Sequence, residues 1–479
     1  MRTWDVVILG TNAAGILAGA LLTKKGFSVL LLEEKEKTGK IRGKYRFRRF
    51  SNFSEVLVRR TVIEGVYQLL DLSLDHGDFI RRRDFNCQII LPGHRVDMSS
   101  DPNDLLREMK REFPRDFGLI ETFYARLKEE DWIRSTMMAI GDEQPPRGRI
   151  GRRLAHVYHA LSDRPLSGFM GSLKGDKTFA QFIDVQIKSM SYLDADDSPF
   201  RLVSHLMGIL LEDEVFTDMT SPRGFMEQVK KEVVRGGGKI NALESFKGIR
   251  IEKSPGEFRI HTGDNKAILS RVCIGNLPFT QLRELIPSAF SGRKWENRGK
   301  LLWPKYFVLS LNLGIDARGV PVRLGDCFVS LRDGGAPYEN GNLLMGFMGP
   351  EGVGAPSGKR AVTVNSFVPM AMGKAGRAEI KGVIENMVCH LLEVAPFLDR
   401  SIRLIDARPS VERYRSQRSN SDIVYGATSP FRVGRAILPA ITPMRGLFIA
   451  SRENFPYLGF EGEIISGIKA AQAVSHRFG

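Results

Sequence analysis

The opening residues of the chain constrain its fold more than any other part of the sequence. Asp5–Gly10 reads DVVILG, an apolar run typical of a buried parallel strand. The stretch that follows, up to Leu22, combines small residues with apolar spacing and predicts a helix packed closely on a sheet, which Gly26 ends. Phe27–Leu32 predicts a second buried strand, closed by Glu33. This order of elements predicts a βαβ unit and therefore an α/β fold.

The same unit has the layout of a dinucleotide-binding site. Gly10 permits a tight turn after the strand, and the backbone N–H groups of Ala13, Ala14 and Gly15 are placed to face a diphosphate. Glu33 lies 23 residues after Gly10, where a carboxylate reaches the ribose hydroxyls. An acid at this position favours a free ribose over a 2′-phosphate.

Asn12 departs from the glycine pattern of such sites. It stands where the middle glycine of G-x-G-x-x-G normally lets the backbone approach the phosphates. Asn tolerates positive φ better than most residues, and its side chain either donates to a phosphate or crowds it. The alternative is a βαβ unit that binds no nucleotide. Because the whole unit and its terminal acid are present, we expect nucleotide binding.

Blocks near both chain ends resemble one group of flavoproteins. After Glu34 the chain has a short polar stretch and then Gly39–Arg42. This order resembles the two-dinucleotide-binding-domain flavoproteins, in which the ribose-binding acid is followed by a short polar stretch and a Gly pair. At the other end, the strand-like Gly446–Ala450 leads through Phe455–Gly462 into a helix-like stretch that reaches Ala471. This segment resembles the flavin-contacting C-terminus of the phytoene desaturase and amine oxidase group.

Internal blocks agree with this resemblance. They are Ile90–Asp97, the helical Asp104–Leu127, Pro222–Phe225, Gly236–Phe246 and Arg271–Asn276. These blocks and the two chain ends occur in the same order as in the FAD-dependent oxidoreductases of this group. The chain therefore resembles that group over nearly the full span of the sequence.

The resemblance implies a Rossmann-like FAD-binding domain assembled from residues 1–50, 220–276 and 407–479. A mixed α+β substrate domain is then formed by residues 51–219 and 277–406. Non-covalent FAD is implied, because no Cys stands in the C-terminal segment. The cofactor-binding residues, from the opening unit and from the resemblance together, are Gly10, Asn12, Ala13, Ala14, Gly15, Glu33, Glu34, Gly39, Lys40, Ile41, Arg42, Phe246, Asn276, Arg452, Glu453, Phe460, Glu461, Gly462 and Ile464.

Two further departures from the family pattern bear on the cofactor. Lys40 replaces the second glycine of the pair, and Arg452 stands where the family usually has an Asp that bonds the ribityl chain. Glu453 replaces that Asp if the register shifts by one residue, or Arg452 reaches the diphosphate as a charged donor. The alternative is a family member that has lost tight FAD binding. Because the segment Gly459–Gly467 is intact, we expect FAD to be retained.

No nucleophile–base arrangement stands out, so no catalytic residue is assigned; flavin chemistry fits this, since the cofactor accepts the hydride. Glu461 and Glu463 fall in the first turn of the flavin-facing helix. For Glu463 we expect stabilisation of a helix start, whereas Glu461 either does the same or tunes the flavin or the substrate. His156 and His159 share a helix face without a third ligand, and Cys389–His390 is expected to be structural, so no metal site is expected.

The chain carries 70 Lys and Arg against 55 Asp and Glu, a net charge of +15. Basic clusters lie at Arg46–Arg49, Arg81–Arg83 and Arg147–Arg153, and the last precedes an apolar, helix-like stretch. An anionic membrane surface and a solvated basic face both explain this pattern. No nucleic-acid motif is present. Four dispersed cysteines, no signal peptide and no apolar run long enough for a bilayer predict a cytoplasmic protein, with peripheral membrane contact as an open alternative.

The sequence therefore predicts a phytoene-desaturase-like FAD enzyme. It would transfer hydride between C–C or C–N bonds of an apolar small molecule and non-covalent FAD. Two alternatives stay open: an amine or amino-acid oxidase of the same fold, and a non-catalytic descendant that binds a lipid or a partner. The oligomeric state is not predicted.

Overall fold

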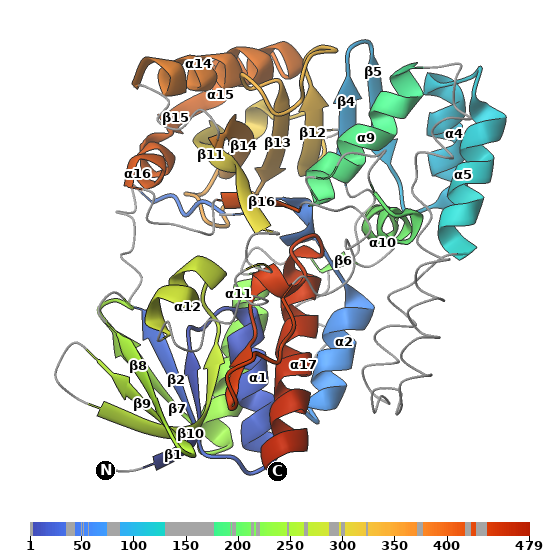
Figure 1. Ribbon diagram of the computed structural model, residues 1–479. Coiled ribbons are helices and arrows are strands. Elements are labelled where there is room, and N and C mark those ends of the chain that lie inside the picture. The colour runs from blue at the N-terminus through green and yellow to red at the C-terminus, as the bar shows by residue number, and fades with distance from the viewer. Residues whose placement is uncertain are drawn as a thin grey trace.

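The computed structural model consists of two parts, each built around its own large β-sheet (Figure 1). Both chain ends lie on the part that holds the first sheet (Figure 1). The residues that the structure describes are 3–34, 44–48, 50, 52–55, 57–73, 87–129, 177–191, 193, 198–211, 215–216, 221–246, 249–262, 267–286, 297, 302–321, 324–370, 377–416, 423–427 and 438–479.

The first sheet contains the strands expected from the opening residues. Its order is β7-β2-β1-β10-β9-β8, with β17 beside the end of β10. Neighbours among β7, β2, β1, β10 and β17 run parallel, whereas β8 and β9 are antiparallel additions. The strands are β1 (Thr3–Leu9), β2 (Val29–Glu34), β7 (Lys239–Leu243), β8 (Arg250–Ser254), β9 (Glu257–His261), β10 (Ala267–Gly275) and β17 (Leu447–Ile449). The parallel core thus joins the two chain ends to the middle of the chain, which confirms the predicted Rossmann-like assembly from discontinuous segments.

Helix α1 (Ala13–Lys24) lies close to this sheet because its residues are small. It is buried from its first residue to Thr23. A Cβ atom at Gly19 would stand 3.0 Å from the side chain of Leu31 in β2, so a larger residue would push the helix outward. Helices α11 (Ser221–Arg235) and α17 (Gly459–Phe478) pack against α1. The C-terminal helix is therefore the direct neighbour of the N-terminal one (Figure 1).

The second sheet is mostly antiparallel. Its order is β15-β11-β14-β13-β12-β4-β5, with β16 beside β11, and only the β12–β4 pair is parallel. Helix α14 (Arg377–Val394) shares one apolar cluster with β11, β13 and β14, while α9 (Lys177–Ser191) packs on β12 and β4. The strands are β4 (Cys87–Leu91), β5 (His94–Met98), β11 (Leu302–Asp316), β12 (Cys327–Leu331), β13 (Leu343–Met348), β14 (Lys359–Pro369), β15 (Ile402–Asp406) and β16 (Ile423–Ala427).

Short elements lie around and between the two sheets. Strands β3 (Val58–Arg59) and β6 (Val215–Phe216) pair where the two parts meet. The remaining described helices are η1 (Phe53–Glu55), α2 (Arg60–Leu69), α4 (Pro102–Glu112), α5 (Phe117–Glu129), α10 (Phe200–Leu210), α12 (Phe279–Leu285), η3 (Ala317–Gly319), α15 (Leu398–Ser401), α16 (Arg408–Ser416) and η7 (Arg452–Asn454).

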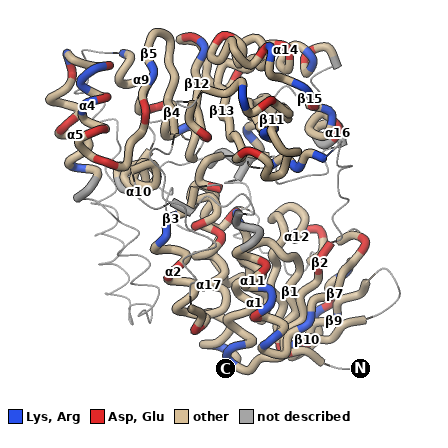
Figure 2. The backbone as a smooth tube through the Cα atoms, turned by 180° about the vertical axis from the view of Figure 1, so that it is seen from behind, with Lys and Arg blue, Asp and Glu red and all other residues tan. Residues whose placement is uncertain are grey.

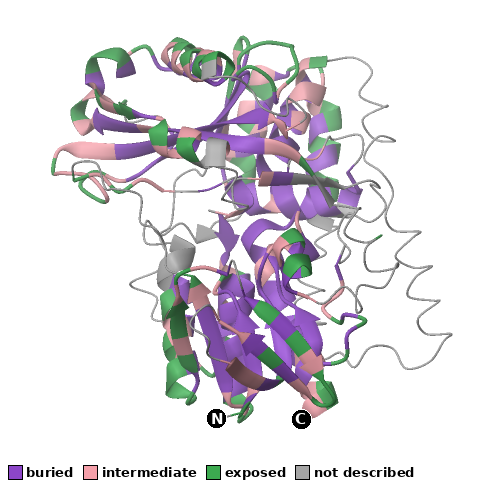
Figure 3. Ribbon diagram, turned by 60° about the vertical axis from the view of Figure 1, so that its left-hand side comes forward, coloured by how far each residue is buried: buried purple, intermediate pink, exposed green. Residues whose placement is uncertain are grey.

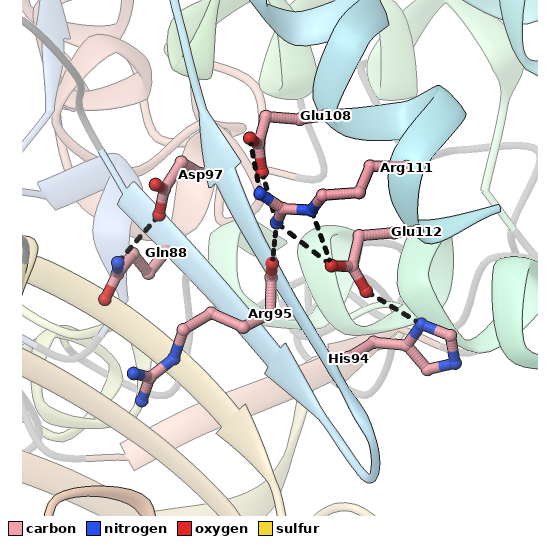
Figure 4. Close-up of polar contacts among 7 residues, drawn as sticks. All are labelled: Gln88, His94, Arg95, Asp97, Glu108, Arg111 and Glu112. Atoms are coloured by element: carbon pink, nitrogen blue, oxygen red, sulfur yellow. Dashed lines mark hydrogen bonds and ion pairs between the residues drawn. The ribbon is translucent and has the colours of Figure 1, made fainter.

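A polar network holds α4 to the β4–β5 hairpin (Figure 4). The guanidinium of Arg111 donates to the carboxylates of Glu108 and Glu112 and to the backbone oxygen of Arg95. The other oxygen of Glu112 lies 3.0 Å from Nδ1 of His94. These contacts link a helix to a hairpin, and no group of three metal-ligating side chains occurs within the described residues.

Two expectations about organisation need correction. The predicted continuous helix over 104–127 is divided, because α4 ends at Glu112 and Pro114 cannot continue it. The segment 407–479 also does not lie entirely with the first sheet, since α16 packs on β11 and β16 pairs with β11. Strand β11 is long enough to accept β15 at one end and β16 at the other, which keeps these residues with the second sheet.

Most strand residues of both sheets are buried (Figure 3), and the buried apolar residues form two clusters. On the outside, acidic and basic residues are interspersed over both parts of the described chain (Figure 2). The basic clusters at 81–83 and 147–153 lie outside the described residues, as do His156 and His159. Among the helices that the structure describes, none is both long and apolar enough to cross a membrane.

Candidate functional site

The candidate site lies at the C-terminal end of β1, where the chain turns into α1. Gly10 has a φ of 109°, which favours glycine, and a Cβ atom there would stand 2.3 Å from the backbone oxygen of Asn276. A Cβ atom at Gly15 would stand 2.5 Å from Oδ1 of the same Asn. Asn12 needs no positive φ, because its backbone is extended at φ −72° and ψ 168°. The predicted tight turn is confirmed, and it tolerates Asn in place of the middle glycine.

Asn276 joins the ends of three parallel strands. It is fully buried, and its backbone N–H donates to the oxygen of Leu9 at 2.8 Å. Its side-chain Oδ1 accepts from the N–H of Asn12 at 2.7 Å, while Nδ2 donates to the oxygen of Ala450. This predicted cofactor-binding residue therefore already uses one of the amides at the start of α1.

Glu463 lies on the face of α17 that crosses α1. A Cβ atom at Gly467 would stand 2.6 Å from the oxygen of Ala14, so α17 crosses α1 with almost no space between the backbones. Glu463 precedes Gly467 by four residues, on the same face of the helix, and the N–H groups of Ala13 and Ala14 favour the charged form of its carboxylate. The helix that begins at Ala13 has no acid in its own first turn and no side-chain bond from its N-cap residue.

Two charged side chains affect this carboxylate. Arg452, from η7, forms an ion pair with Glu55 from η1. Burial raises the pKa of Glu463 to about 7, and the carboxylate of Glu55 acts in the same direction. Arg452 and the two amides oppose that shift by favouring the charged form. Arg452 therefore pairs with Glu55 and also favours the charged form of Glu463.

The carboxylate expected to hold a ribose is also engaged. Lys230, from α11, lies with its Nζ 2.8 Å from Oε1 of Glu33, and the hydroxyl of Thr11 donates to the same oxygen at 3.0 Å. Burial alone would lower the pKa of Lys230, but its contact with Glu33 raises it above the usual value. Lys230 and Thr11 therefore contact the same oxygen of the Glu33 carboxylate, which would accept from the ribose hydroxyls.

A buried contact between a carboxylate and an imidazole lies at the start of α17. Glu461 and His205 are both almost completely inaccessible, and their Oε2 and Nε2 atoms are 2.8 Å apart. The N–H of Arg59 donates to the second oxygen of Glu461, and its guanidinium donates to the oxygen of His205. Burial alone would raise the pKa of Glu461, but His205 and Arg59 hold it below its usual value. Glu461 therefore links α17 to β3 and α10 at the junction of the two parts.

The other predicted site residues are placed less directly. Glu453 is buried and accepts from the N–H of Phe279, so it caps α12. Phe460 packs edge-on against Phe225, with ring centroids 6.1 Å apart. Gly462 is required because a Cβ atom there would stand 2.5 Å from a backbone oxygen. Phe246 and Ile464 are buried and Glu34 is exposed, while Gly39, Lys40, Ile41 and Arg42 lie outside the described residues.

The backbone of the site fits a diphosphate, but side chains already contact parts of it. The turn has the glycines and the helix N-terminus that an anion requires. The N–H of Asn12 donates to Asn276, and Thr11 and Lys230 contact Glu33. FAD therefore fits this site only with Lys230 sharing or releasing Glu33.

Comparison with known proteins shows the same fold over the whole chain. No family model matches the sequence, and no curated protein matches it. An oxidoreductase from Methanosarcina mazei is similar in structure, with a TM-score of 0.60 at 16% identity, covering 99% of this chain and 100% of that one. Cyclohexylamine oxidase from Brevibacterium oxydans has a TM-score of 0.60 at 13% identity, with 99% of each chain covered. An engineered putrescine oxidase has a TM-score of 0.61 at 14% identity, again with 99% of each covered. The predicted resemblance to the amine oxidase and desaturase group is thus confirmed for the fold.

Sequence reasoning missed several residues of this site. It considered Glu463 only as a stabiliser of a helix start, and it assigned no role to Lys230, Arg59 or His205. Two acids in the first turn of a helix that otherwise matches a flavin-contacting segment were the available signal for Glu463. Nothing local marks Lys230, because its partner Glu33 lies on strand β2, 197 residues away in the chain.

Proposed function

We propose that this protein is a flavin-dependent oxidoreductase that transfers hydride between C–C or C–N bonds of an apolar small molecule and non-covalent FAD. The observation that carries the proposal is the meeting of the two chain ends. The first turn of α1 lies against α17 at Gly467, at the carboxyl end of a parallel sheet, where ligands of α/β proteins bind. The chain-long likeness to oxidases supports it.

Each part of the site has a distinct role in this proposal. FAD, when bound, supplies the hydride acceptor. The amides and dipole of α1 bind the diphosphate, and Glu33 accepts from the ribose hydroxyls. The N-terminus of α17, near Phe460 and Gly462, stabilises negative charge that develops close to it. The second part covers the junction and excludes water from it.

The visible spectrum of freshly purified protein tests the proposal, followed by titration of the apo-protein with FAD. We expect a yellow protein, or one that becomes yellow on reconstitution, with FAD released on denaturation. Glu33→Ala should weaken FAD binding about tenfold, whereas Glu385→Ala on exposed α14 serves as the matched control. A colourless protein that takes up no FAD at any concentration would reject the proposal. A peroxide-coupled amine screen separates an amine oxidase from a desaturase.

A non-catalytic descendant is the second candidate, and the contacts of Asn276 and Lys230 favour it. These contacts satisfy one amide and the acid of the cofactor site from within the chain. This candidate predicts no flavin and no turnover, together with a lipid or other apolar molecule that co-purifies. Mass spectrometry of the purified protein distinguishes it from the first proposal.

Contact with an anionic membrane surface is proposed on sequence grounds. The basic segment Arg147–Arg153 and the helix-like stretch after it support it. Co-sedimentation with vesicles containing phosphatidylserine, compared with neutral vesicles, is the test. If the protein bound neither kind of vesicle, or bound both equally, the membrane proposal would be rejected and the basic segment would be a solvated face.

A further inference from the structure

We propose that Lys230 is a positioning residue of the cofactor site: its ammonium holds the carboxylate of Glu33 in the orientation that accepts from the 2′-hydroxyl of the adenosine ribose. This inference rests on the proposed flavin-binding function and concerns recognition of the sugar at one end of the same site. Lys230 lies on α11, 197 residues from Glu33 in the chain, so the dinucleotide-binding pattern of the opening residues does not include it.

Two donors from different elements converge on one oxygen of Glu33. The Nζ atom of Lys230 lies 2.8 Å from Oε1, and the hydroxyl of Thr11, in the turn after β1, donates to the same oxygen at 3.0 Å. A carboxylate has about four acceptor positions on its two oxygens. The two contacts therefore restrict the orientation of the carboxylate, and neither of them uses Oε2. Lys230 and a ribose hydroxyl can share Glu33 in this arrangement.

The backbone fixes both partners. Val229 and Val233, on either side of Lys230, are fully buried, and α11 packs against α1. Glu33 lies at the end of β2, where its backbone is paired with that of Ala242 in β7. The ammonium and the carboxylate are thus held by a packed helix and a paired strand of the same sheet, which is the support that a precise binding site needs.

The pair is accessible to a ligand. The side chain of Lys230 is 20% exposed and that of Glu33 is 34% exposed. An ion pair with this exposure contributes little to the stability of the fold. It contributes more to binding, because a side chain that is already ordered loses less freedom when a ligand binds. The contact with Glu33 also raises the pKa of Lys230, so the ammonium is charged at neutral pH.

Two other roles for Lys230 predict different results. A competitor for the ribose hydroxyls would be displaced by the nucleotide, so its removal would strengthen binding. A purely structural ion pair would affect every adenine nucleotide alike, whether or not the ribose carries a 2′-hydroxyl. Positioning of Glu33 predicts a loss of affinity that depends on this hydroxyl, because that is the group the acid of such a site binds.

Isothermal titration of the full chain with ADP and with 2′-deoxy-ADP tests the inference, and the ratio of the two affinities is the readout. We expect the native chain to bind ADP about tenfold more tightly, as one hydrogen bond to a charged group would give. Lys230→Met should lower this ratio to about twofold, and Lys230→Arg should restore most of it. Lys231→Met removes the same charge from the next, exposed position of α11 and should leave the ratio unchanged.

A second variant keeps the test decisive. Circular dichroism shows whether each variant is folded, and if Lys230→Met does not fold, Thr11→Val removes the other donor to the same oxygen and should lower the ratio in the same direction. A ratio that stays at the native value in the folded variants, or that rises, would overturn the inference.

Titration with FAD separates this inference from the proposed function. If FAD binds the native chain but the ratio is the same in Lys230→Met and Lys231→Met, the positioning role is refuted and flavin binding stands. If the ratio falls as expected but no chain binds FAD, the positioning role stands and the flavin proposal fails. If no chain binds ADP or FAD, both fail.

Discussion

Replacement of Asn276 should test whether the site holds the first sheet together. In Asn276→Ala, the oxygen of Ala450 loses its partner in a buried position, and the N–H of Asn12 loses its partner in a part-buried one. An unsatisfied buried donor or acceptor costs about 1–3 kcal/mol. Because water can replace the partner of Asn12, we expect the free energy of unfolding to fall by about 2 kcal/mol. Asn276→Asp keeps the acceptor for the N–H of Asn12 but sets a carboxylate oxygen against the oxygen of Ala450. The free energy of unfolding of this variant should therefore fall by a similar amount.

Urea unfolding followed by tryptophan fluorescence measures this change, because Trp4 lies buried in β1. Asn241→Ala is the matched control, since Asn241 is exposed in β7 of the same sheet. An exposed substitution of this kind usually changes stability by less than about 0.5 kcal/mol. If Asn276→Ala were no less stable than the Asn241 variant, the reasoning that Asn276 joins the three strand ends would be refuted.

Three further predictions concern α17. Burial raises the pKa of Glu463 to about 7 from an ordinary 4.5. The protonated side chain therefore favours the folded state below pH 4.5, and this contribution to the free energy of unfolding, up to about 3 kcal/mol, is lost as the pH rises toward 7. Glu463→Gln should remove this part of the pH dependence, as measured by urea titrations at several pH values. Gly467→Ala places a Cβ atom against the backbone oxygen of Ala14 and should cost about 2 kcal/mol, with a lower thermal midpoint than Gly382→Ala on α14, where a Cβ atom meets open space. The pKa of Glu461 is lowered, so its contribution to stability is present above pH 4.5 and is lost as the pH falls. Glu461→Gln should leave His205 without its anionic partner, lower the free energy of unfolding by about 3 kcal/mol at pH 7, and remove the loss of stability at acid pH. If the variant lost stability with falling pH as the native chain does, the pairing would be contradicted.

Much of the fold could be predicted because its signals are local. The apolar runs of β1 and β2, the small residues of α1 and the glycine at position 10 determine a βαβ unit within 34 residues. The C-terminal strand and helix were recognisable for the same reason. Pro114, which divides α4 from α5, was also visible in the sequence.

The state of the site could not be predicted, because its contacts join residues far apart in the chain. Asn276 meets Asn12 across 264 residues, and Lys230 meets Glu33 across 197. Glu453 was considered for a flavin contact, but its partner is the first amide of α12. No local pattern reports which side chain reaches which amide, since this depends on the order of the strands and on how closely two helices cross.

The sequence by itself determined that this chain forms a parallel sheet with a glycine turn and a helix N-terminus at its edge, because strand burial, turn geometry and helix spacing are properties of short segments. Only the tertiary structure decided what lies on that helix N-terminus. Gly467 allows α17 to approach α1, and Asn276, which lies 264 residues further along the chain, accepts from the amide of Asn12. The physical reason is that an anion site is made by backbone donors that any nearby acceptor can use, so its occupant is set by the packing of distant segments.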